Sequence, residues 1–512
     1  MKFETFELER NQSLYENKVD YNLSESGIHP LKMSEILTTK EQKEILGLEL
    51  SYGHTNGTTL LRKRVSDIYQ SGLSEKNVLI TSGSAEANFL SVLTKLDKDD
   101  EIIYMTPNYL QIAHLSRSLG IKVNELPLRQ ELGWQWDIQE LERMVNTKTK
   151  MVVICNPNNP TGAIMSDLVF EAIVDISKQN NLWILSDEVY RGSELNGVEC
   201  RSFAGATPKT IVNGGLSKAY SLPGLRIGWT IGSEEYIQKV WSLHDYTVIS
   251  ISFLSDWIAS LVLEESRRKK ILLRTKSRLI ENFEIINQWS KEVPELKITM
   301  PEAAAITFAK LNINIPSEEF VFSLRDQKSV LLTAGKWHGL EGYIRIGYGA
   351  PKTYVQSALD RITSFIQENK INFEKMMVLI INFLKLILFL EFKFSRLEEK
   401  VFTVVPQIEI NLRAGYLIDS SLKVTPDSIL VRGPKSILDT LNSIQSESII
   451  ADDLYENFRK IVSLRSIPEI QLSESKVTVE VAVSRYTEKE FLLNVEVINL
   501  PLGTRVKLFP PK

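Results

Sequence analysis

The sequence predicts an α/β fold over its first 370 residues, with a large domain followed by a smaller α+β domain. Three observations lead to this prediction. Short apolar runs alternate with helical patterns up to about residue 280, as in sheets built from strand and helix units. Long helices with charges on one face follow, for example over 270–289, and 341–349 then alternates like a strand. Beyond residue 401, several alternating stretches predict a separate β-rich module, which follows an apolar helix at 376–394.

Composition limits the kinds of protein this can be. A chain of 512 residues is too long for one core and predicts two or three domains. The net charge of -4, with 24% charged residues, indicates an ordinary surface without a basic face for nucleic acid. Two cysteines, Cys155 and Cys200, suit a reducing compartment, and the five scattered histidines do not predict a zinc site. Since the first residues lack an apolar core, we expect no signal peptide and a cytoplasmic location for this part.

The most informative stretch is 213–229, where a single lysine, Lys218, stands among glycine, serine and alanine. A primary amine can form a Schiff base with an aldehyde cofactor, and small neighbours let that cofactor approach the backbone. Arg226, eight positions later, can bind a phosphate through its planar guanidinium. The alternative is a surface lysine in a glycine-rich loop, with Arg226 paired to a carboxylate.

Two apolar runs end in residues that could bind a ligand. The first, 77–82, passes through Gly83 into a helical pattern, so the backbone of Gly83, Ser84 and Ala85 is a candidate phosphate cup at a helix N-terminus. The second ends at Asp187, which places a carboxylate where open α/β sheets bind ligands. An acid at this position can also serve only as a helix cap.

With these motifs in this order, the first 370 residues resemble the class I/II aminotransferases, the fold type I group of pyridoxal-phosphate (PLP) enzymes. The resemblance implies the aspartate aminotransferase fold, with a large domain over about 40–280 built on a mixed, mostly parallel sheet. The small α+β domain would consist of the N-terminal arm plus about 281–370. It also implies a homodimer with shared active sites. The implied reaction is transamination between an L-amino acid and a 2-oxo acid.

The resemblance also assigns roles to single residues. Lys218 would be the Schiff-base and proton-shuttling group, Asp187 would hold the pyridine nitrogen protonated, and Tyr190 would donate to the phenolic oxygen beside Asn159. The candidate cofactor contacts are Gly83, Ser84, Ala85, Tyr109, Asn159, Asp187, Tyr190, Lys218, Arg226 and, on the neighbouring subunit's cofactor, Tyr52. The candidate substrate contacts are Gly27, Asn159 and Arg345, with Arg345 as the clamp for the α-carboxylate.

Some alternatives stay open at this stage. Tyr52 and Tyr109 can be packing residues, and Arg345 can be an ordinary exposed strand arginine. Gly215 replaces a serine that the family often has three residues before the lysine, which removes one phosphate hydrogen bond. A β-elimination lyase or a synthase similar to aminocyclopropane-carboxylate synthase would use the same cofactor and fold.

The C-terminal quarter differs in character. The apolar run at 376–394 favours a membrane anchor over a buried or interfacial helix, because Lys385 and Lys393 could extend their charges to the interface. The β-rich region 401–512 resembles YbbR-like domains on the motif 422–438, with a truncated repeat at its end. The join suggests a fusion of two neighbouring coding regions. An envelope scaffold carrying an inactive PLP fold is therefore the alternative to an enzyme.

Overall fold

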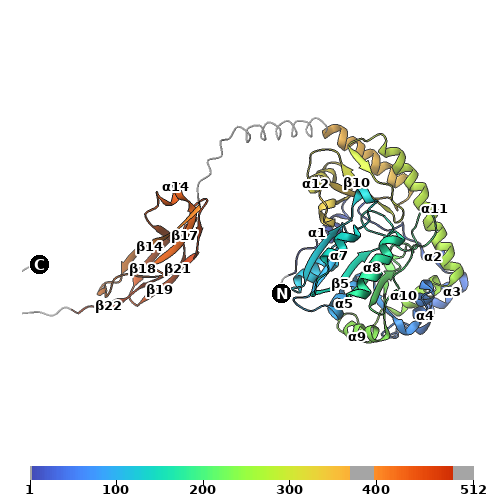
Figure 1. Cartoon of the computed structure of the whole chain (residues 1–512), viewed down its shortest axis with the longest axis horizontal. Coiled ribbons are helices and arrows are strands. Elements are labelled where there is room, and N and C mark those ends of the chain that lie inside the picture. Colours follow the sequence, from blue (N-terminus) through green and yellow to red (C-terminus); the bar gives the residue numbers. More distant parts are fainter. Residues whose placement is uncertain (1–2, 370–396, 488–512) are drawn as a thin grey trace, which may run out of the picture. The chain divides into compact units, whose positions relative to one another are not determined.

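The computed structural model describes residues 3–369 and 397–487. The chain forms two compact units, Met1–Phe383 and Leu384–Lys512, and each is described by itself (Figure 1). The apolar helix predicted at 376–394 and the strand predicted at 491–497 lie outside the described residues. Among the residues described, no helix combines the length and apolar character needed to cross a membrane.

The first unit is built on a seven-stranded sheet in the order β2-β8-β7-β6-β5-β3-β4. All neighbours are parallel except β8, which runs antiparallel to β2 and β7, so the predicted mixed, mostly parallel sheet is confirmed. The strands are β2 (Val78–Ser82), β3 (Glu101–Thr106), β4 (Lys122–Pro127), β5 (Thr149–Cys155), β6 (Trp183–Asp187), β7 (Thr210–Gly215) and β8 (Ile227–Ile231).

Both faces of this sheet are covered by helices, which explains why its inner strands are apolar runs. Ile103 and Met105 of β3 point into one core, and Ile102 and Tyr104 point into the core on the opposite face. The first core includes residues of α4 (Thr59–Tyr69), α7 (Ile138–Met144), α8 (Asp167–Gln179) and α10 (Phe253–Val262). The second includes residues of α5 (Ser84–Lys95), α6 (Gln111–Ser118) and α9 (Glu234–His244).

The long helix α11 (Glu265–Ser290) connects this layered body to a smaller α+β part. Its first half contributes Ile271 to the large core, and its second half contributes Phe283 to a separate core. The smaller part has an antiparallel sheet in the order β12-β13-β10-β9. Its elements are β9 (Leu296–Ile298), β10 (Ile306–Leu311), α12 (Ser317–Lys328), β11 (Val330–Leu331), β12 (Thr333–Ala334), β13 (Tyr343–Gly347) and a helix over 352–369.

The N-terminal arm belongs to the smaller part. After α1 (Glu7–Tyr15), the short strand β1 (Tyr21–Asn22) pairs in parallel with β11. The following residues press against the end of β13, where a Cβ on Gly347 would lie 2.0 Å from the carbonyl oxygen of Glu25. Only glycine permits this approach, and it brings the arm beside Arg345 of β13. Two short helices, α2 (Met33–Ile36) and α3 (Thr39–Leu46), then lead into α4.

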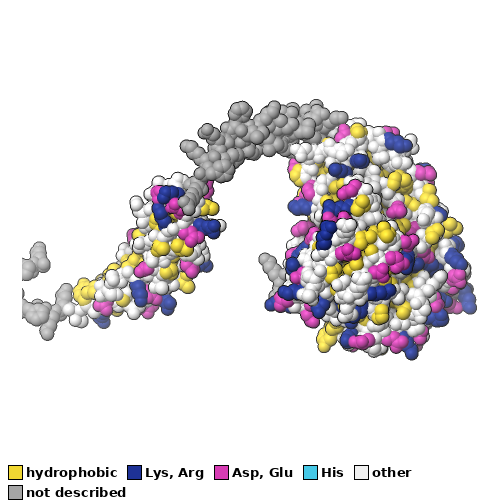
Figure 2. Space-filling view, viewed as in Figure 1, with side chains coloured by type: hydrophobic (Ala, Val, Ile, Leu, Met, Phe, Trp, Pro, Cys, Tyr) yellow, Lys and Arg dark blue, Asp and Glu magenta, His cyan; other side chains and the backbone are white. Residues whose placement is uncertain are grey.

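The second unit is β-rich, as predicted. Its main sheet has the order β18-β14-β17-β20, and its core includes Val431, Ile444 and Val479. The predicted strand at 404–410 lies within β14, and the one at 476–483 covers β21 and the start of β22. The elements are β14 (Leu397–Leu412), β15 (Tyr416–Ile418), β16 (Lys423–Thr425), β17 (Ser428–Pro434), α14 (Lys435–Leu438), β18 (Ile444–Leu454), β19 (Phe458–Ser463), β20 (Gln471–Leu472), β21 (Lys476–Val481) and β22 (Val483–Arg485). On the face seen in Figure 2, side chains of both charges are interspersed on each unit, as the small net charge implies.

Candidate active site

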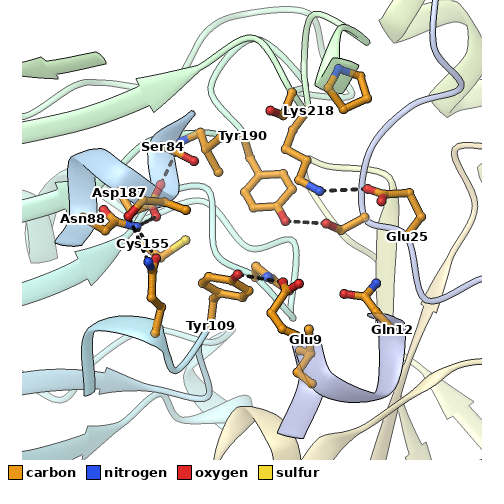
Figure 3. A pocket seen from close by; sticks show the side chains of 18 of the residues that line it. Glu9, Gln12, Glu25, Ser84, Asn88, Tyr109, Cys155, Asp187, Tyr190 and Lys218 are labelled. Atoms are coloured by element: carbon orange, nitrogen blue, oxygen red, sulfur yellow. Dashed lines mark hydrogen bonds and ion pairs between the residues drawn. The ribbon is translucent and has the colours of Figure 1, made fainter. Parts of the chain in front are cut away.

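A cavity of about 300 Å³ opens where β5 and β6 end, between the sheet and the N-terminal arm (Figure 3). This is the edge of the sheet at which the sequence predicts a ligand site. Nine predicted site residues line it, namely Ser84, Ala85, Tyr109, Asn159, Asp187, Tyr190, Lys218, Arg226 and Arg345. Of the others, Gly83 lies directly beneath the Arg226 guanidinium and Gly27 lines an adjoining cavity. Tyr52 lies outside the cavity and is 84% exposed.

Asp187 is the last residue of β6, and its carboxylate is held by two donors. Asn88 Nδ2 donates to Oδ2 at 2.9 Å, and the Val189 amide donates to Oδ1 at 3.2 Å. Asn213 Nδ2 in turn donates to Asn88 Oδ1 at 2.8 Å, which fixes the orientation of that amide. Burial raises the pKa of Asp187, because the two hydrogen bonds only partly offset the loss of water. No salt bridge reaches this carboxylate from the described residues, so its charge lacks a cationic partner.

Lys218 follows β7 and projects toward the arm. Its Nζ lies 2.8 Å from Oε1 of Glu25, which is itself half exposed at 51%. Burial lowers the pKa of Lys218, but the Glu25 carboxylate more than offsets this and leaves the pKa above its ordinary value. The Lys218 ammonium, together with hydrogen bonds, lowers the pKa of Glu25 to about 2. The pair is therefore ionised at neutral pH.

Arg345 is buried at 2% exposure, which rules out the exposed strand arginine considered from sequence. Its Nη1 donates to Asn159 Oδ1 at 2.8 Å, and its Nη2 donates to the carbonyl oxygen of Ser24. The Nε has no hydrogen-bond partner among the residues that the structure describes. A buried guanidinium with a free donor favours binding of an anion, and carboxylate has the matching fork geometry.

The N-terminus of α5 forms the floor of the cavity beside Arg226. The N-cap residue is Gly83, with φ +79°, and no side chain caps the helix. A Cβ on Gly83 would lie 2.5 Å from Nη2 of Arg226, and one on Gly228 would lie 2.4 Å from the Ser84 nitrogen. These glycines keep the Ser84 and Ala85 end of the helix accessible next to a guanidinium, an arrangement that favours phosphate.

Two tyrosines complete the cavity wall. Tyr190 is buried and its hydroxyl donates to Ser26 Oγ at 2.8 Å. The Tyr109 hydroxyl donates to Glu9 Oε1 at 2.7 Å, and its ring packs edge-on against Phe6 at 4.9 Å. Tyr109 thus combines a packing contact with a position on the cavity wall.

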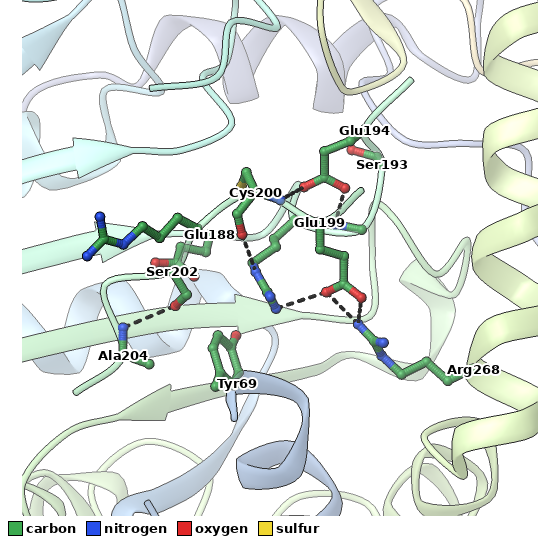
Figure 4. A network of polar contacts seen from close by, with 12 residues as sticks. Tyr69, Glu188, Ser193, Glu194, Glu199, Cys200, Ser202, Ala204 and Arg268 are labelled. Atoms are coloured by element: carbon green, nitrogen blue, oxygen red, sulfur yellow. Dashed lines mark hydrogen bonds and ion pairs between the residues drawn. The ribbon is translucent and has the colours of Figure 1, made fainter. Parts of the chain in front are cut away.

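A buried polar network supports the segment that follows Asp187 (Figure 4). Glu188 accepts from the Phe203 amide at 2.9 Å, and burial raises its pKa to about 7. Arg191 and Arg268 both bind Glu199, at 2.9 and 2.7 Å. These contacts hold the loop carrying Tyr190 against the body of the large domain.

Sequence patterns did not identify several residues of this site. Asn88 could have been identified from the sequence. It lies four residues after Ser84, so it is one helical turn further along α5 on the same face. No sequence pattern could have identified Glu9 and Glu25, because each comes from the N-terminal arm and reaches the cavity only when the chain folds.

The sequence profile described as "Aminotransferase class I and II" matches residues 23–362, which is most of the first unit. The chain belongs to this aminotransferase family. An aspartate aminotransferase of Pyrococcus horikoshii is 28% identical over 346 residues, covering 65% of this chain and 88% of its own. A glutamate-pyruvate aminotransferase of Haemophilus influenzae is 29% identical over 337 residues, covering 62% and 83%. The crystal structure of a PLP-dependent aminotransferase from Streptococcus suis has a TM-score of 0.68 at 31% identity, covering 72% and 99%.

The chain is thus a PLP-dependent aminotransferase with the aspartate aminotransferase fold. Its cavity fits the cofactor on two observations. The uncapped helix end under Arg226 offers donors to a phosphate, and a Cβ on either neighbouring glycine would collide there. Buried Asp187 offers an unpaired carboxylate to a protonated ring nitrogen.

Proposed function

We propose that this enzyme transfers the amino group of an L-amino acid to a 2-oxo acid, with Lys218, Asp187 and Arg345 in the principal roles. The observation that carries the proposal is their convergence in one cavity, together with the uncapped end of α5 and Arg226. With the cofactor bound, an L-amino acid would be converted to its 2-oxo acid, and a second 2-oxo acid would be converted to the product amino acid.

The cofactor is held by groups that the fold presents in advance. Ser84, Ala85 and Arg226 would bind its phosphate and Asp187 would bind its ring nitrogen, with Tyr109 and Tyr190 on the cavity wall. When bound, pyridoxal phosphate supplies an electron sink for the bonds at the substrate Cα. Asn88 donates to Asp187 and so stabilises its carboxylate form, and Asn213 fixes the orientation of the Asn88 amide.

Lys218 Nζ would hold the cofactor aldehyde and would move the proton at the substrate Cα. Its neighbour Glu25 is ionised and lies 2.8 Å away, so it stabilises the ammonium form of Lys218, whose proton must be lost before the amine reacts. Arg345 orients the substrate by binding its α-carboxylate through the free Nε and the forked guanidinium. Asn159, which already accepts from Arg345, fixes that orientation.

We further propose that the enzyme is a homodimer in the cytoplasm whose Tyr52 reaches the neighbouring subunit's cofactor. The 84% exposure of Tyr52, together with exposed Leu46 and Leu50 in the same segment, supports an interface there. For the second unit we propose a YbbR-like module. The predicted motif folds as β16, β17 and α14, with Ile429 and Val431 of β17 buried in its core.

The test is spectroscopic and chemical. Purified protein with added pyridoxal phosphate should show the visible absorption band of a lysine-bound cofactor, and an L-amino acid should discharge that band. Borohydride reduction followed by peptide mapping should place the label on Lys218. A label on another lysine would overturn the assignment, and a band that no amino acid discharges would overturn transamination.

A further inference from the structure

One side of the active-site cavity is acidic. Glu9, Gln12 and Glu16 follow one another at spacings of three and four in and just after α1, so they share one helical face, and all three line the cavity. Glu25 from the arm lines the cavity as well. Figure 3 shows Gln12 and Glu25 on the side away from Asp187, with Glu9 reaching in from the helix.

The charges of the lining residues do not balance on this side. The only cations among the described lining residues are Lys218, Arg226 and Arg345. The proposed function commits all three, to the cofactor aldehyde, the phosphate and the substrate α-carboxylate. Glu9, Glu16 and Glu25 are then left facing the cavity without a cation. Carboxylates that line one side of a cavity without a cation give it a negative potential, which attracts a positive ligand.

Arg345 indicates where that ligand would lie. Its guanidinium is buried at 2% exposure, lines the cavity and has an unpartnered Nε, so it indicates an anionic ligand group independently of the acids. Burial lowers the pKa of Arg345, while the nearby carboxylates of Glu25 and Glu9 act in the opposite direction. The clamp and the acids therefore belong to the same side of the cavity. An amino acid bound by its α-carboxylate at Arg345 has its side chain within reach of them.

We propose that this cavity selects an L-amino acid whose side chain ends in a cation, either a guanidinium or an ammonium, with Glu9, Glu16 and Glu25 as the specificity residues. The proposal rests on the transaminase function given above and names its substrate class. A cationic side chain pairs with the acids, and the side-chain oxygen of Gln12 is a neutral acceptor beside them, since its Nε2 already donates to Ser24. An acidic side chain would add a fourth carboxylate to the three, which disfavours aspartate and glutamate as amino donors.

The experiment compares isosteres with and without charge. The holoenzyme is mixed with L-arginine or its neutral isostere L-citrulline, with L-lysine or its neutral isostere L-2-aminoheptanoate, and with L-glutamate, and discharge of the cofactor band is followed in a single turnover. Each cationic amino acid should react at least about tenfold more efficiently than its neutral isostere, since a charged hydrogen bond contributes about 1.5 to 3 kcal/mol. Glutamate should react more slowly than either cationic amino acid.

A binding measurement separates recognition from turnover. Titration calorimetry of the holoenzyme with 5-guanidinopentanoate, which has no amino group to transfer, should give a Kd at least about tenfold below that of hexanoate. Glu9→Gln and Glu16→Gln should each reduce the arginine to citrulline ratio by about three- to tenfold. Glu7→Gln is the matched control, because Glu7 is an exposed residue of the same helix outside the cavity and should leave the ratio unchanged.

The outcomes separate this proposal from the one on which it rests. If no amino acid discharges the cofactor, transamination itself fails. If glutamate, citrulline or 2-aminoheptanoate reacts as well as the cationic amino acids, transamination stands and the substrate class is wrong. If arginine is preferred but Glu9→Gln, Glu16→Gln and Glu7→Gln all keep the preference, these acids are not its source. Should one variant fail to fold, the wild-type ratios and the two Kd values still decide the substrate class.

Discussion

Asn88→Ala should raise the pKa of Asp187, because it removes the 2.9 Å hydrogen bond that stabilises the buried carboxylate. A hydrogen bond to a charged group contributes about 1.5 to 3 kcal/mol, and one pKa unit corresponds to about 1.4 kcal/mol. The pKa of Asp187 should therefore rise by about one to two units. Since Asp187 must be ionised to bind a protonated ring nitrogen, the acid limb of the kcat/KM profile should move to higher pH by the same amount.

The assay is the pH profile of kcat/KM for Asn88→Ala and wild type, with thermal unfolding measured in parallel. Ser91→Ala is the matched control, because Ser91 lies on the same helix and contacts Asn213 at 3.2 Å without touching Asp187. Its acid limb should stay in place. An unchanged acid limb in Asn88→Ala, accompanied by a loss of thermal stability similar to that of the control, would show that Asn88 only supports the helix.

Three further predictions follow from the same structure. Arg345→Lys should raise KM for the amino acid by about ten- to hundredfold with a smaller effect on kcat, since an ammonium cannot reproduce the forked contacts; initial-rate kinetics would show it, and an unchanged KM would contradict the clamp. Burial raises the pKa of Glu188 to about 7 from 4.5, so the folded protein holds a proton that the unfolded chain releases. Protonated Glu188 should therefore add about 3 kcal/mol to the free energy of unfolding below pH 4.5, and this contribution should be lost as pH rises through 7. Glu188→Gln should abolish this pH dependence of the free energy of unfolding, measured with urea across that range. A chain ending at Asn369 should be soluble, dimeric and as active as the full chain, whereas the full chain should partition to membranes if 376–394 inserts; fractionation and turnover assays test both statements.

Local sequence patterns were sufficient to predict the large domain and the centre of its site. Asp187 ends one short apolar run, and Gly83 directly follows another. Such runs form buried parallel strands, and the carboxyl ends of these strands lie at one edge of the sheet. Lys218 and Arg226 lie in one glycine-rich stretch, so their proximity depended only on a tight local turn. The β-rich second unit was predicted in the same way, from alternation with a period of two.

The acidic side of the site was decided only by the tertiary structure. Glu25 meets Lys218 across 193 positions of sequence, and Asn88 meets Asp187 across 99. The first contact exists because β1 pairs with β11 and Gly347 allows the arm to press against β13. No periodicity or spacing within one segment encodes such contacts, since they depend on how separate elements pack. The sequence by itself therefore determined the fold and the cofactor chemistry, and packing of the N-terminal arm decided which charges face the substrate.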